Sequence, residues 1–464
     1  MTAFNVTKTT NSPFAGGVDN VIDLADQAMF LGERATGATG LLQCAWDYHH
    51  AIDIDGLRRF HQHLQQGRLR RAIERSPLPF GRHRWVSPRH FSDIEIVAAR
   101  PRADFDAWLV EQAHTRLDAE QGPPWHLAVL PFAEGGAGVS LVLSHCLADG
   151  LGLCEALADA ASGRDGAMCW PAPGSARRSR VLRADIRQTV RDSRASARAV
   201  AAVARMAWRE RGGAAPSPGR LAGRDEPIAM PMTKVFLDGD EWDARAHAAG
   251  GTSNALFAAV AARLGQRVGR IATDGSLVLA MPVNERIPGD TRANAVTNAD
   301  ITIPRVPIPT DLREIRATIK DALIRHNEVP DERWALMPLV PFLPKRLVKR
   351  LVGVAAGTPS TVVASNLGAV DPAVTRADGT PAHNFAMMSL FPGVTTSMMR
   401  STGGRLALAS GRVHGRLFIS VLAYQPDRFN SNDVLRQDLL ATLGEFALTA
   451  TCGWPQPGPR DEAA

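Results

Sequence analysis

The stretch GVSLVLSHCLADGLGL, residues 138–153, decides the fold of this chain. Its first half contains the run VSLVL, which predicts a buried strand that delivers His145 at its end. Asp149 and Gly150 interrupt this pattern, and residues 151–161 then have the apolar spacing of a helix. A rigid strand end aims an imidazole, and the loop after it leaves room for a substrate. His145 is therefore placed where a general base would be.

The length and composition of the chain predict two lobes. It has 464 residues, of which 45% are hydrophobic, and this is too long for one ordinary core but enough to fill two. The net charge of +6 suggests attraction to anionic partners, such as the phosphates of coenzyme A, an acidic carrier protein or a lipid surface. No nucleic-acid recognition motif is present, so we expect no nucleic-acid partner.

The five cysteines are odd in number, scattered and without metal-ligand spacing, which predicts free thiols in a reducing cytoplasm. They are Cys44, Cys146, Cys154, Cys169 and Cys452. The N-terminal stretch has no apolar run after its lysine, and no uninterrupted apolar run of about 18 residues exists in the chain. We therefore expect a cytoplasmic protein, without a secretory signal or a membrane span, and favour a monomer.

The first lobe is predicted to cover residues 21–175, after a flexible tail at 1–20. Two glycines at 135–136 separate two stretches that have the pattern of strands, so we expect these strands to form a hairpin. The expected elements of this lobe are helices at 21–32, 55–66 and 104–117 and strands at 41–48, 125–130 and 139–143.

Residues 176–211 differ from the rest of the chain, because they hold eleven arginines and only three acidic residues beside a helical apolar stripe. One interpretation is a basic amphipathic helix that lies on an anionic membrane surface. The other is a connector helix between the lobes with a solvated arginine face. We favour the connector, because the apolar side is mostly alanine and would insert weakly. A linker rich in Gly, Ala and Pro then extends the connector region to residue 219.

The second lobe is predicted to cover residues 220–453, before a flexible tail at 454–464. Its pattern again mixes strands and helices, so the fold class is α/β, more closely α+β. Residues 338–353 mix apolar and basic residues and could cover a hydrophobic opening. The other expected elements are strands at 231–237, 276–283, 299–303, 362–370, 406–413 and 416–424 and helices beginning near 252 and at 312.

The positions of the residues around His145 predict structural roles for them, apart from catalysis. Ser144 and Cys146 alternate to the other side of the strand, so we expect a local hydrogen bonder and a packing residue. Asp149 precedes a glycine and could serve its own turn, or it could orient the histidine. For a structural role it needs a cation, and Arg286, at the end of another buried strand, is the best candidate because its fork can hold a carboxylate. The simpler interpretation of this arginine is a surface charge.

The motif SHCLADG at residues 144–150 resembles the HHxxxDG signature of the thioester-dependent acyltransferase superfamily. That superfamily includes condensation domains of nonribosomal peptide synthesis, polyketide-associated acyltransferases and wax ester synthases. The first histidine of the signature is Ser144 here. Other stretches resemble the superfamily in the same order: IDLADQAMFLGE at 22–33, GPPWHL at 122–127, MPVNER at 281–286, Asn294 and VASNLG at 363–368.

The resemblance implies two chloramphenicol-acetyltransferase-like lobes, each a mixed sheet with helices, with an active-site tunnel between them. His145 would be the general base, Asp149 would pair with Arg286, and Gly150 would leave space and a backbone N–H near the oxyanion. Ser144 would support the site. The residues implied in substrate binding are Ser365, Asn366, Asn294 and Trp125. The reaction would need no metal and no bound cofactor, only an acyl-coenzyme A or acyl-carrier-protein thioester as co-substrate.

We therefore expect an acyltransferase that forms an ester or amide on a hydroxyl or amine acceptor. One alternative is a non-catalytic scaffold that binds an acyl thioester or a carrier protein. Another is a wax ester or triacylglycerol-forming enzyme at a membrane surface, with peripheral contact through residues 176–211. The run Asn366-Leu367-Gly368 lacks the proline of the lipid branch, which keeps a role in secondary metabolism open.

Overall fold

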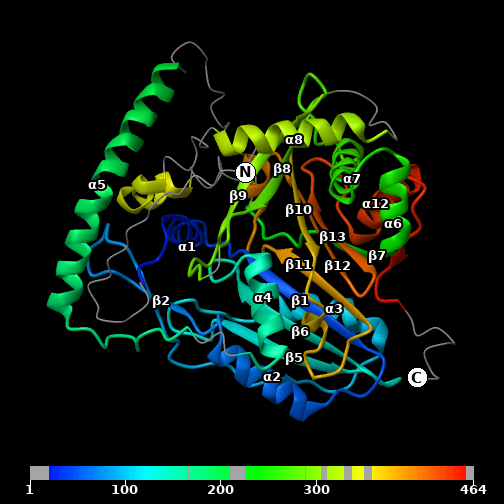
Figure 1. Cartoon of the computed structure of the whole chain (residues 1–464), viewed down its shortest axis with the longest axis horizontal. Coiled ribbons are helices and arrows are strands. Elements are labelled where there is room, and N and C mark those ends of the chain that lie inside the picture. The colour runs from blue at the N-terminus through cyan, green and yellow to red at the C-terminus, as the bar shows by residue number, and fades with distance from the viewer. Residues whose placement is uncertain are drawn as a thin grey trace.

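The computed structural model describes residues 20–164, 168–209, 225–287, 289–304, 311–328, 337–349 and 358–455. Two lobes, each a β-sheet with helices packed on it, make up the mixed α/β fold that the sequence predicts (Figure 1). Nearly all of the two expected tails and the last part of the expected 338–353 cover lie outside the described residues. The five cysteines are all free, as expected from their number and spacing.

The sheet of the first lobe has five strands in the order β11-β1-β6-β5-β4. Every residue of its two central strands, β1 and β6, is buried. Strands β5 and β6 form the expected antiparallel hairpin, with Gly135 and Gly136 at φ values of 100° and 84° in its turn. The strand bounds are Leu41–Tyr48 (β1), Glu95–Ile96 (β4), Trp125–Pro131 (β5), Ala137–Ser144 (β6) and Asn384–Leu390 (β11).

Three helices of the first lobe begin directly after an aspartate whose side chain caps them. Asp23 caps α1, Asp53 caps α2, and Asp149 caps α4. Helix α3 is shorter than predicted, because a 3₁₀ turn occupies its start and the helix ends at Gln112. The bounds are Leu24–Thr36 (α1), Ile54–Gln66 (α2), Phe105–Gln112 (α3) and Gly150–Ala161 (α4), and a small separate hairpin pairs Ala72–Glu74 (β2) with Arg84–Val86 (β3).

The sheet of the second lobe has seven strands in the order β14-β7-β13-β12-β10-β8-β9. The strands are Met232–Asp238 (β7), Leu277–Asn284 (β8), Val296–Ile303 (β9), Thr361–Ala369 (β10), Arg405–Val413 (β12), Arg416–Tyr424 (β13) and Thr451–Cys452 (β14). The helices are Gly239–Ala248 (α6), Ser253–Arg267 (α7), Arg313–Glu328 (α8), Thr396–Ser401 (α11) and Asn432–Glu445 (α12). In this half of the chain the sequence patterns miss α6, α11, α12, β14 and also β11.

The two faces of the second sheet have different neighbours. On β12, Leu406 and Leu408 belong to the core that the sheet shares with α7 and α12. Ala407 and Ala409 alternate with them and line a small cavity whose wall includes Leu390 of β11. Because side chains alternate along a strand, the odd-numbered residues of β12 face the first lobe.

Strand β11 joins the two lobes. It follows residue 220, where we place the start of the second lobe, yet it pairs along its whole length with β1 of the first sheet. The pairing runs antiparallel, from Leu41 opposite Leu390 to Asp47 opposite Asn384. A strand from the second half of the chain therefore completes the edge of the first sheet.

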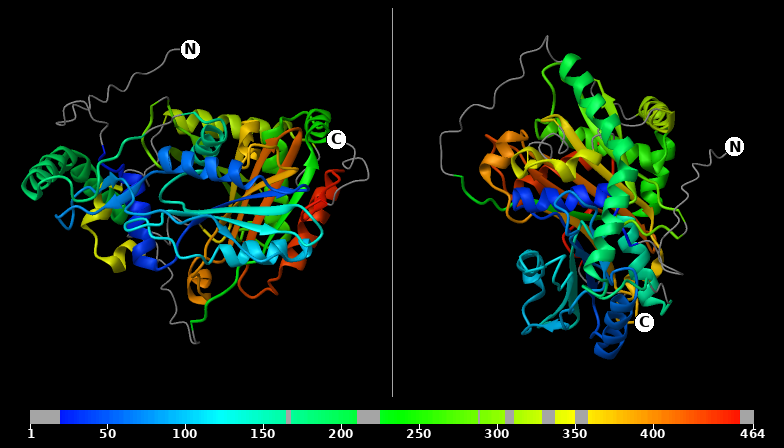
Figure 2. Two further views of the ribbon diagram at one scale, coloured as in Figure 1. Left: turned by 90° about the horizontal axis from the view of Figure 1, so that it is seen from below. Right: turned by 90° about the vertical axis from the view of Figure 1, so that its left-hand side faces the viewer.

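Helix α5, Arg178–Arg209, forms the expected basic connector helix and runs along the outside of the molecule, clearest in the right-hand view of Figure 2. Two acidic residues hold it to the first lobe. Asp185 pairs with Arg84 and accepts a hydrogen bond from Ser76, and Asp192 pairs with Arg82 at 3.3 Å. The described part of the 338–353 stretch includes a 3₁₀ helix, Met337–Phe342 (η3), that lies against α1 and α5.

Candidate active site

His145 directly follows β6 and is held through its backbone by groups from both lobes. Its N–H donates to the carbonyl of Gly40 at 2.8 Å, and its carbonyl accepts from the side-chain amide of Asn294 at 3.0 Å. The imidazole is half-buried, and Nδ1 has no hydrogen-bond partner among the described residues. The position of the ring is therefore set from the backbone, and its nitrogen atoms are left for other partners.

The surroundings of His145 favour the neutral imidazole. Burial lowers its pKa below the ordinary value, and the negative charge of Asp149 opposes this only in part. A neutral imidazole at pH 7 can accept a proton, which is what a general base requires.

Asp149 is fully engaged by other groups than His145. One carboxylate oxygen accepts from the Gly152 N–H at 2.6 Å, which caps α4. The other accepts from Arg286 at 2.6 Å and from the Ala295 N–H at 2.8 Å. The sequence left two structural roles open for Asp149, a bond within its own turn and a pair with an arginine, and the structure shows both. No hydrogen bond joins Asp149 to His145, so the carboxylate shapes the loop and does not orient the ring directly.

Arg286 is a buried ion-pair partner, so its interpretation as a surface charge is wrong. Its side chain is 4% exposed. Besides Asp149 it donates to the carbonyls of Arg292 and Ala293, both at 3.1 Å. Gly152 is required beside it, because a Cβ there would stand 2.8 Å from the guanidinium.

Asp26, on α1, is a supporting residue of the candidate site that the sequence reasoning missed. Its carboxylate accepts from the backbone N–H groups of Ala293 and Asn294, both at 2.9 Å, and from the Asn294 side chain at 3.1 Å. Burial raises its pKa to about 6, although these hydrogen bonds oppose the shift. The available signal was an acidic residue among the apolar positions of an amphipathic helix. Through Asn294, Asp26 supports the backbone of His145.

Ser144 forms a polar cluster behind His145. Its hydroxyl lies 3.3 Å from the carboxylate of Glu33 on α1 and 3.0 Å from the Cys146 sulfur. Glu33 also accepts from the Gly40 N–H at 3.1 Å, and burial raises its pKa to about 7. The residue before His145 is thus a serine hydrogen-bonded to a glutamate. Cys146 is fully buried, in keeping with a packing role.

The lobes meet tightly at Gly150, the first residue of α4. A Cβ on Gly150 would stand 2.9 Å from the Leu367 side chain of β10. The two neighbours of Leu367 have different surroundings. Ser365 lines the small cavity between the lobes, and Asn366 donates to Asn254 of α7 at 3.1 Å.

Two residues expected to bind substrate have structural positions instead. Trp125 is 1% exposed and packs between His61 and Phe91, so the core of the first lobe covers its ring. Asn294 is 5% exposed, and its amide is committed to Asp26 and to the His145 carbonyl. Their burial leaves them almost no surface for a substrate. We correct both assignments to packing and support.

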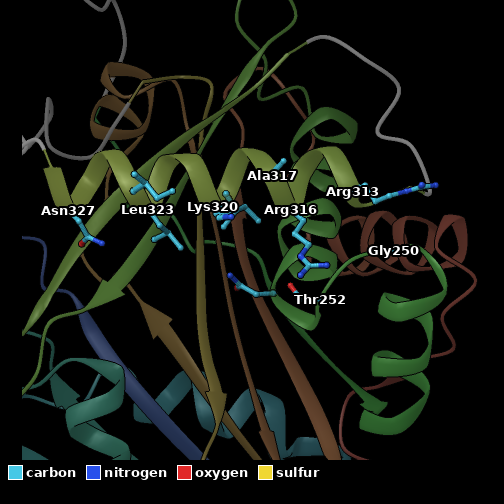
Figure 3. A pocket seen from close by; sticks show the side chains of 11 residues that line it. Gly250, Thr252, Arg313, Arg316, Ala317, Lys320, Leu323 and Asn327 are labelled. Atoms are coloured by element: carbon cyan, nitrogen blue, oxygen red, sulfur yellow. The ribbon is translucent and has the colours of Figure 1, made fainter. Parts of the chain in front are cut away.

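A groove of about 670 Å³ lies between α8 and the start of α7 (Figure 3). Figure 3 shows Arg316 pointing from α8 toward Thr252, with Lys320 one turn along the same helix. In the described part of the chain neither cation has an ion pair. The groove includes Asn254, so a single hydrogen bond connects it with Asn366, but it does not include His145.

Comparison with solved structures defines the fold. Polyketide synthase associated protein 5 from Mycobacterium tuberculosis is 17% identical, with a TM-score of 0.53 over 93% of this chain and 99% of that one. The first condensation domain of the CDA synthetase is 16% identical, with a TM-score of 0.54 over 93% and 96%. The chain has the condensation-domain fold.

The same fold recurs inside larger proteins. The nonribosomal peptide synthetase FmoA3 is 19% identical, with a TM-score of 0.55 over 94% of this chain but only 43% of that one. No protein-family model matches the sequence, and no curated protein matches it. At these identities the likeness defines the architecture, whereas the chemistry must be argued from the residues of this chain.

Proposed function

We propose that this protein is an acyltransferase that moves an acyl group from a coenzyme A or carrier-protein thioester to a hydroxyl or amine acceptor. The observation that carries the proposal is the placement of His145. It is a neutral imidazole at the end of a buried strand, and both lobes hold its backbone. The condensation-domain fold supports the same reaction class, because solved examples belong to nonribosomal peptide synthetases.

In the proposed mechanism, His145 Nε2 removes the proton from the acceptor as its oxygen or nitrogen attacks the thioester carbonyl. The C–S bond then breaks, the new ester or amide forms, and the imidazolium returns the proton to the leaving thiolate. The N–H of Gly150, at the start of α4, is the proposed donor to the oxyanion. Asp149 and Arg286 position the loop, and Ser365 and Asn366 contact the substrates from the second lobe.

The direct test is His145→Ala in a transfer assay with a panel of acyl thioesters and alcohol or amine acceptors. Loss of a general base should lower the rate by roughly 10²–10⁴-fold while the thermal unfolding temperature stays unchanged. The matched control is His114→Ala, since His114 is an exposed histidine in the same lobe. Full activity of the His145 variant would overturn the proposal.

The same panel separates the enzyme from a non-catalytic scaffold. A scaffold would bind a thioester or a carrier protein, measured by calorimetry, without releasing a free thiol. The engaged pair of Asp149 and Arg286 beside His145 favours the enzyme, because binding alone does not require an ordered base.

The groove beside α7 favours an anionic donor. Arg316 and Lys320 line it without an ion pair among the described residues, Arg313 lines it while paired with Asp311 at 2.9 Å, and the described lining itself holds no acidic side chain. Phosphate groups of a coenzyme A or phosphopantetheine thioester carry the complementary charge. We propose that the donor approaches here, next to Asn366.

A peripheral membrane contact through α5 is the second proposal, and a lipid-forming reaction would accompany it. Leu182, Ile186 and Val190 are 37%, 50% and 66% exposed and lie at intervals of four residues on one face. Exposed arginines, including Arg183 and Arg187, border this face. Apolar and cationic surfaces side by side suit an anionic lipid surface. No described helix is long and apolar enough to cross a bilayer.

A further inference from the structure

Arg405 is the first residue of β12 and lies on the face of the second sheet that looks toward the first lobe. It pairs with Tyr424 of β13, and it alternates with Leu406, which belongs to the helix-covered core. Two and four residues further along the same face, Ala407 and Ala409 line the cavity that includes Ser365. Arg405 thus stands at one end of the surface to which we assign the substrates.

Within the described part of the chain, the guanidinium of Arg405 has no partner of opposite charge. Among the described residues no hydrogen bond or ion pair reaches any of its nitrogen atoms, and Nε is buried without a partner. Burial lowers its pKa to about 10, so it stays charged at pH 7. Arg405 is half-buried, and a charge that loses part of its hydration without gaining a partner is costly.

The neighbouring Arg270 provides a contrast. Its guanidinium donates to the carbonyls of Thr358, Thr361 and Gly403 at 2.9 to 3.2 Å, so its hydrogen-bonding capacity is used within the protein. The same part of the fold therefore satisfies one arginine with its own backbone and leaves the other free.

Arg405 also lies close to the candidate base. Its Cζ is 3.7 Å from the centroid of the Phe391 ring. If Gly40 carried a Cβ, that atom would lie 3.6 Å from the edge of the Phe391 ring and 3.6 Å from the His145 Cβ. The ring and His145 therefore border the same small space. Glu33 reaches the same point, where it accepts from Gly40 and Ser144, and it forms no ion pair with Arg405. One aromatic ring separates the free guanidinium from the wall around His145.

We propose that Arg405 binds a carboxylate on the acyl group or on the acceptor, so that the enzyme selects a carboxylate-bearing substrate. This inference rests on the proposed acyltransferase function. A guanidinium offers two parallel donors that match the two oxygens of a carboxylate. The single charge of Arg405 balances one carboxylate, whereas a phosphate dianion would keep an excess negative charge, because the neighbouring Arg270 is occupied by carbonyl groups.

The test compares the wild-type protein with Arg405→Gln and Arg405→Lys on two substrate pairs. The donor pair is succinyl-pantetheine and its methyl ester, and the acceptor pair is 3-hydroxybutyrate and its methyl ester. For one of these two pairs, the wild-type protein should have a kcat/KM about 10- to 100-fold higher with the carboxylate than with its methyl ester. The glutamine variant should lose that preference and keep its rate on the ester, while the lysine variant should lose part of it. The pair that responds identifies the substrate that carries the carboxylate.

A binding measurement keeps this inference separate from the proposed function. Calorimetric titration of the same four compounds needs no turnover, so it reports on Arg405 even if no transfer occurs. Tighter binding of a carboxylate than of its ester by wild type, lost in Arg405→Gln, would support the inference. Equal binding of acid and ester by wild type would overturn it. An equal loss of acid and ester binding in the glutamine variant would also overturn it, because that pattern indicates a structural role.

Discussion

At the scale of single residues, the candidate site separates the group that reacts from the groups that hold it. Among the described residues the ring nitrogens of His145 form no hydrogen bond. Asp149, Arg286, Asp26 and Asn294, in contrast, form hydrogen bonds with backbone groups and with one another. A base must exchange its proton with a substrate, so free nitrogens suit it. A support must not move, and buried polar groups that are held by several hydrogen bonds are rigid.

The pH dependence of transfer should report this environment. The base is active when neutral, and burial lowers the pKa of His145, so kcat/KM should stay level from pH 8 downward and fall only below pH 6.5. The measurement is a pH profile of kcat/KM. Glu33→Gln is the control, because the pKa of Glu33 is raised to about 7 and it lies beside Ser144. An inflection above pH 6.5 that persists in this variant would contradict the assignment.

Removal of one partner of the buried pair should cost stability. Arg286→Gln leaves the Asp149 carboxylate buried without its cation, and such losses amount to about 3–5 kcal/mol in the free energy of unfolding. Urea denaturation measures it. The matched control is Arg58→Gln, whose pair with Asp55 is exposed and is expected to contribute less than about 1 kcal/mol. A loss in the Arg286 variant no larger than in the control would show that the pair does not stabilise the fold.

At the scale of elements, the site is built where three segments meet. The β6-to-α4 loop supplies His145 and Asp149, α1 supplies Asp26, and the loop between β8 and β9 supplies Arg286 and the backbone groups around Asn294. Figure 1 shows α1 and α4 of the first lobe near the end of β9.

Helix α5 gives a prediction at this scale. If its apolar stripe contacts lipid, the protein should sediment with vesicles that contain phosphatidylglycerol, more strongly at low salt, and not with phosphatidylcholine alone. Replacing Ile186 and Val190 by glutamate should abolish the effect, because both are exposed and no core packing is lost. Absence of sedimentation with anionic vesicles would leave α5 as a connector held by Asp185 and Asp192.

At the scale of the whole molecule, the lobes are interdependent. Strand β11 from the second half of the chain covers the edge of β1, and residues 293–295 supply partners to Asp26 and Asp149. An uncovered strand edge and an unpaired buried carboxylate are both unfavourable.

A fragment that ends at residue 209 should therefore not fold on its own. We expect it to lack near-ultraviolet circular dichroism and a cooperative thermal transition, while the full chain shows both. Co-expression with a second fragment that starts at residue 225 should restore the signal, since that fragment carries β11. A lone first fragment that melts as cooperatively as the full chain would contradict this dependence.

The sequence by itself determined the local structure and the candidate base. The strand before His145, the turn at Asp149 and Arg286 as the best candidate for its cation all follow from periodicity, turn chemistry and charge, which act over short distances or through one strong interaction. Only the tertiary structure decided that Trp125 and Asn294 are buried supports, that Asp26 holds the loop and that Arg405 is unpaired. These properties depend on which distant segments lie side by side, and no local pattern encodes that.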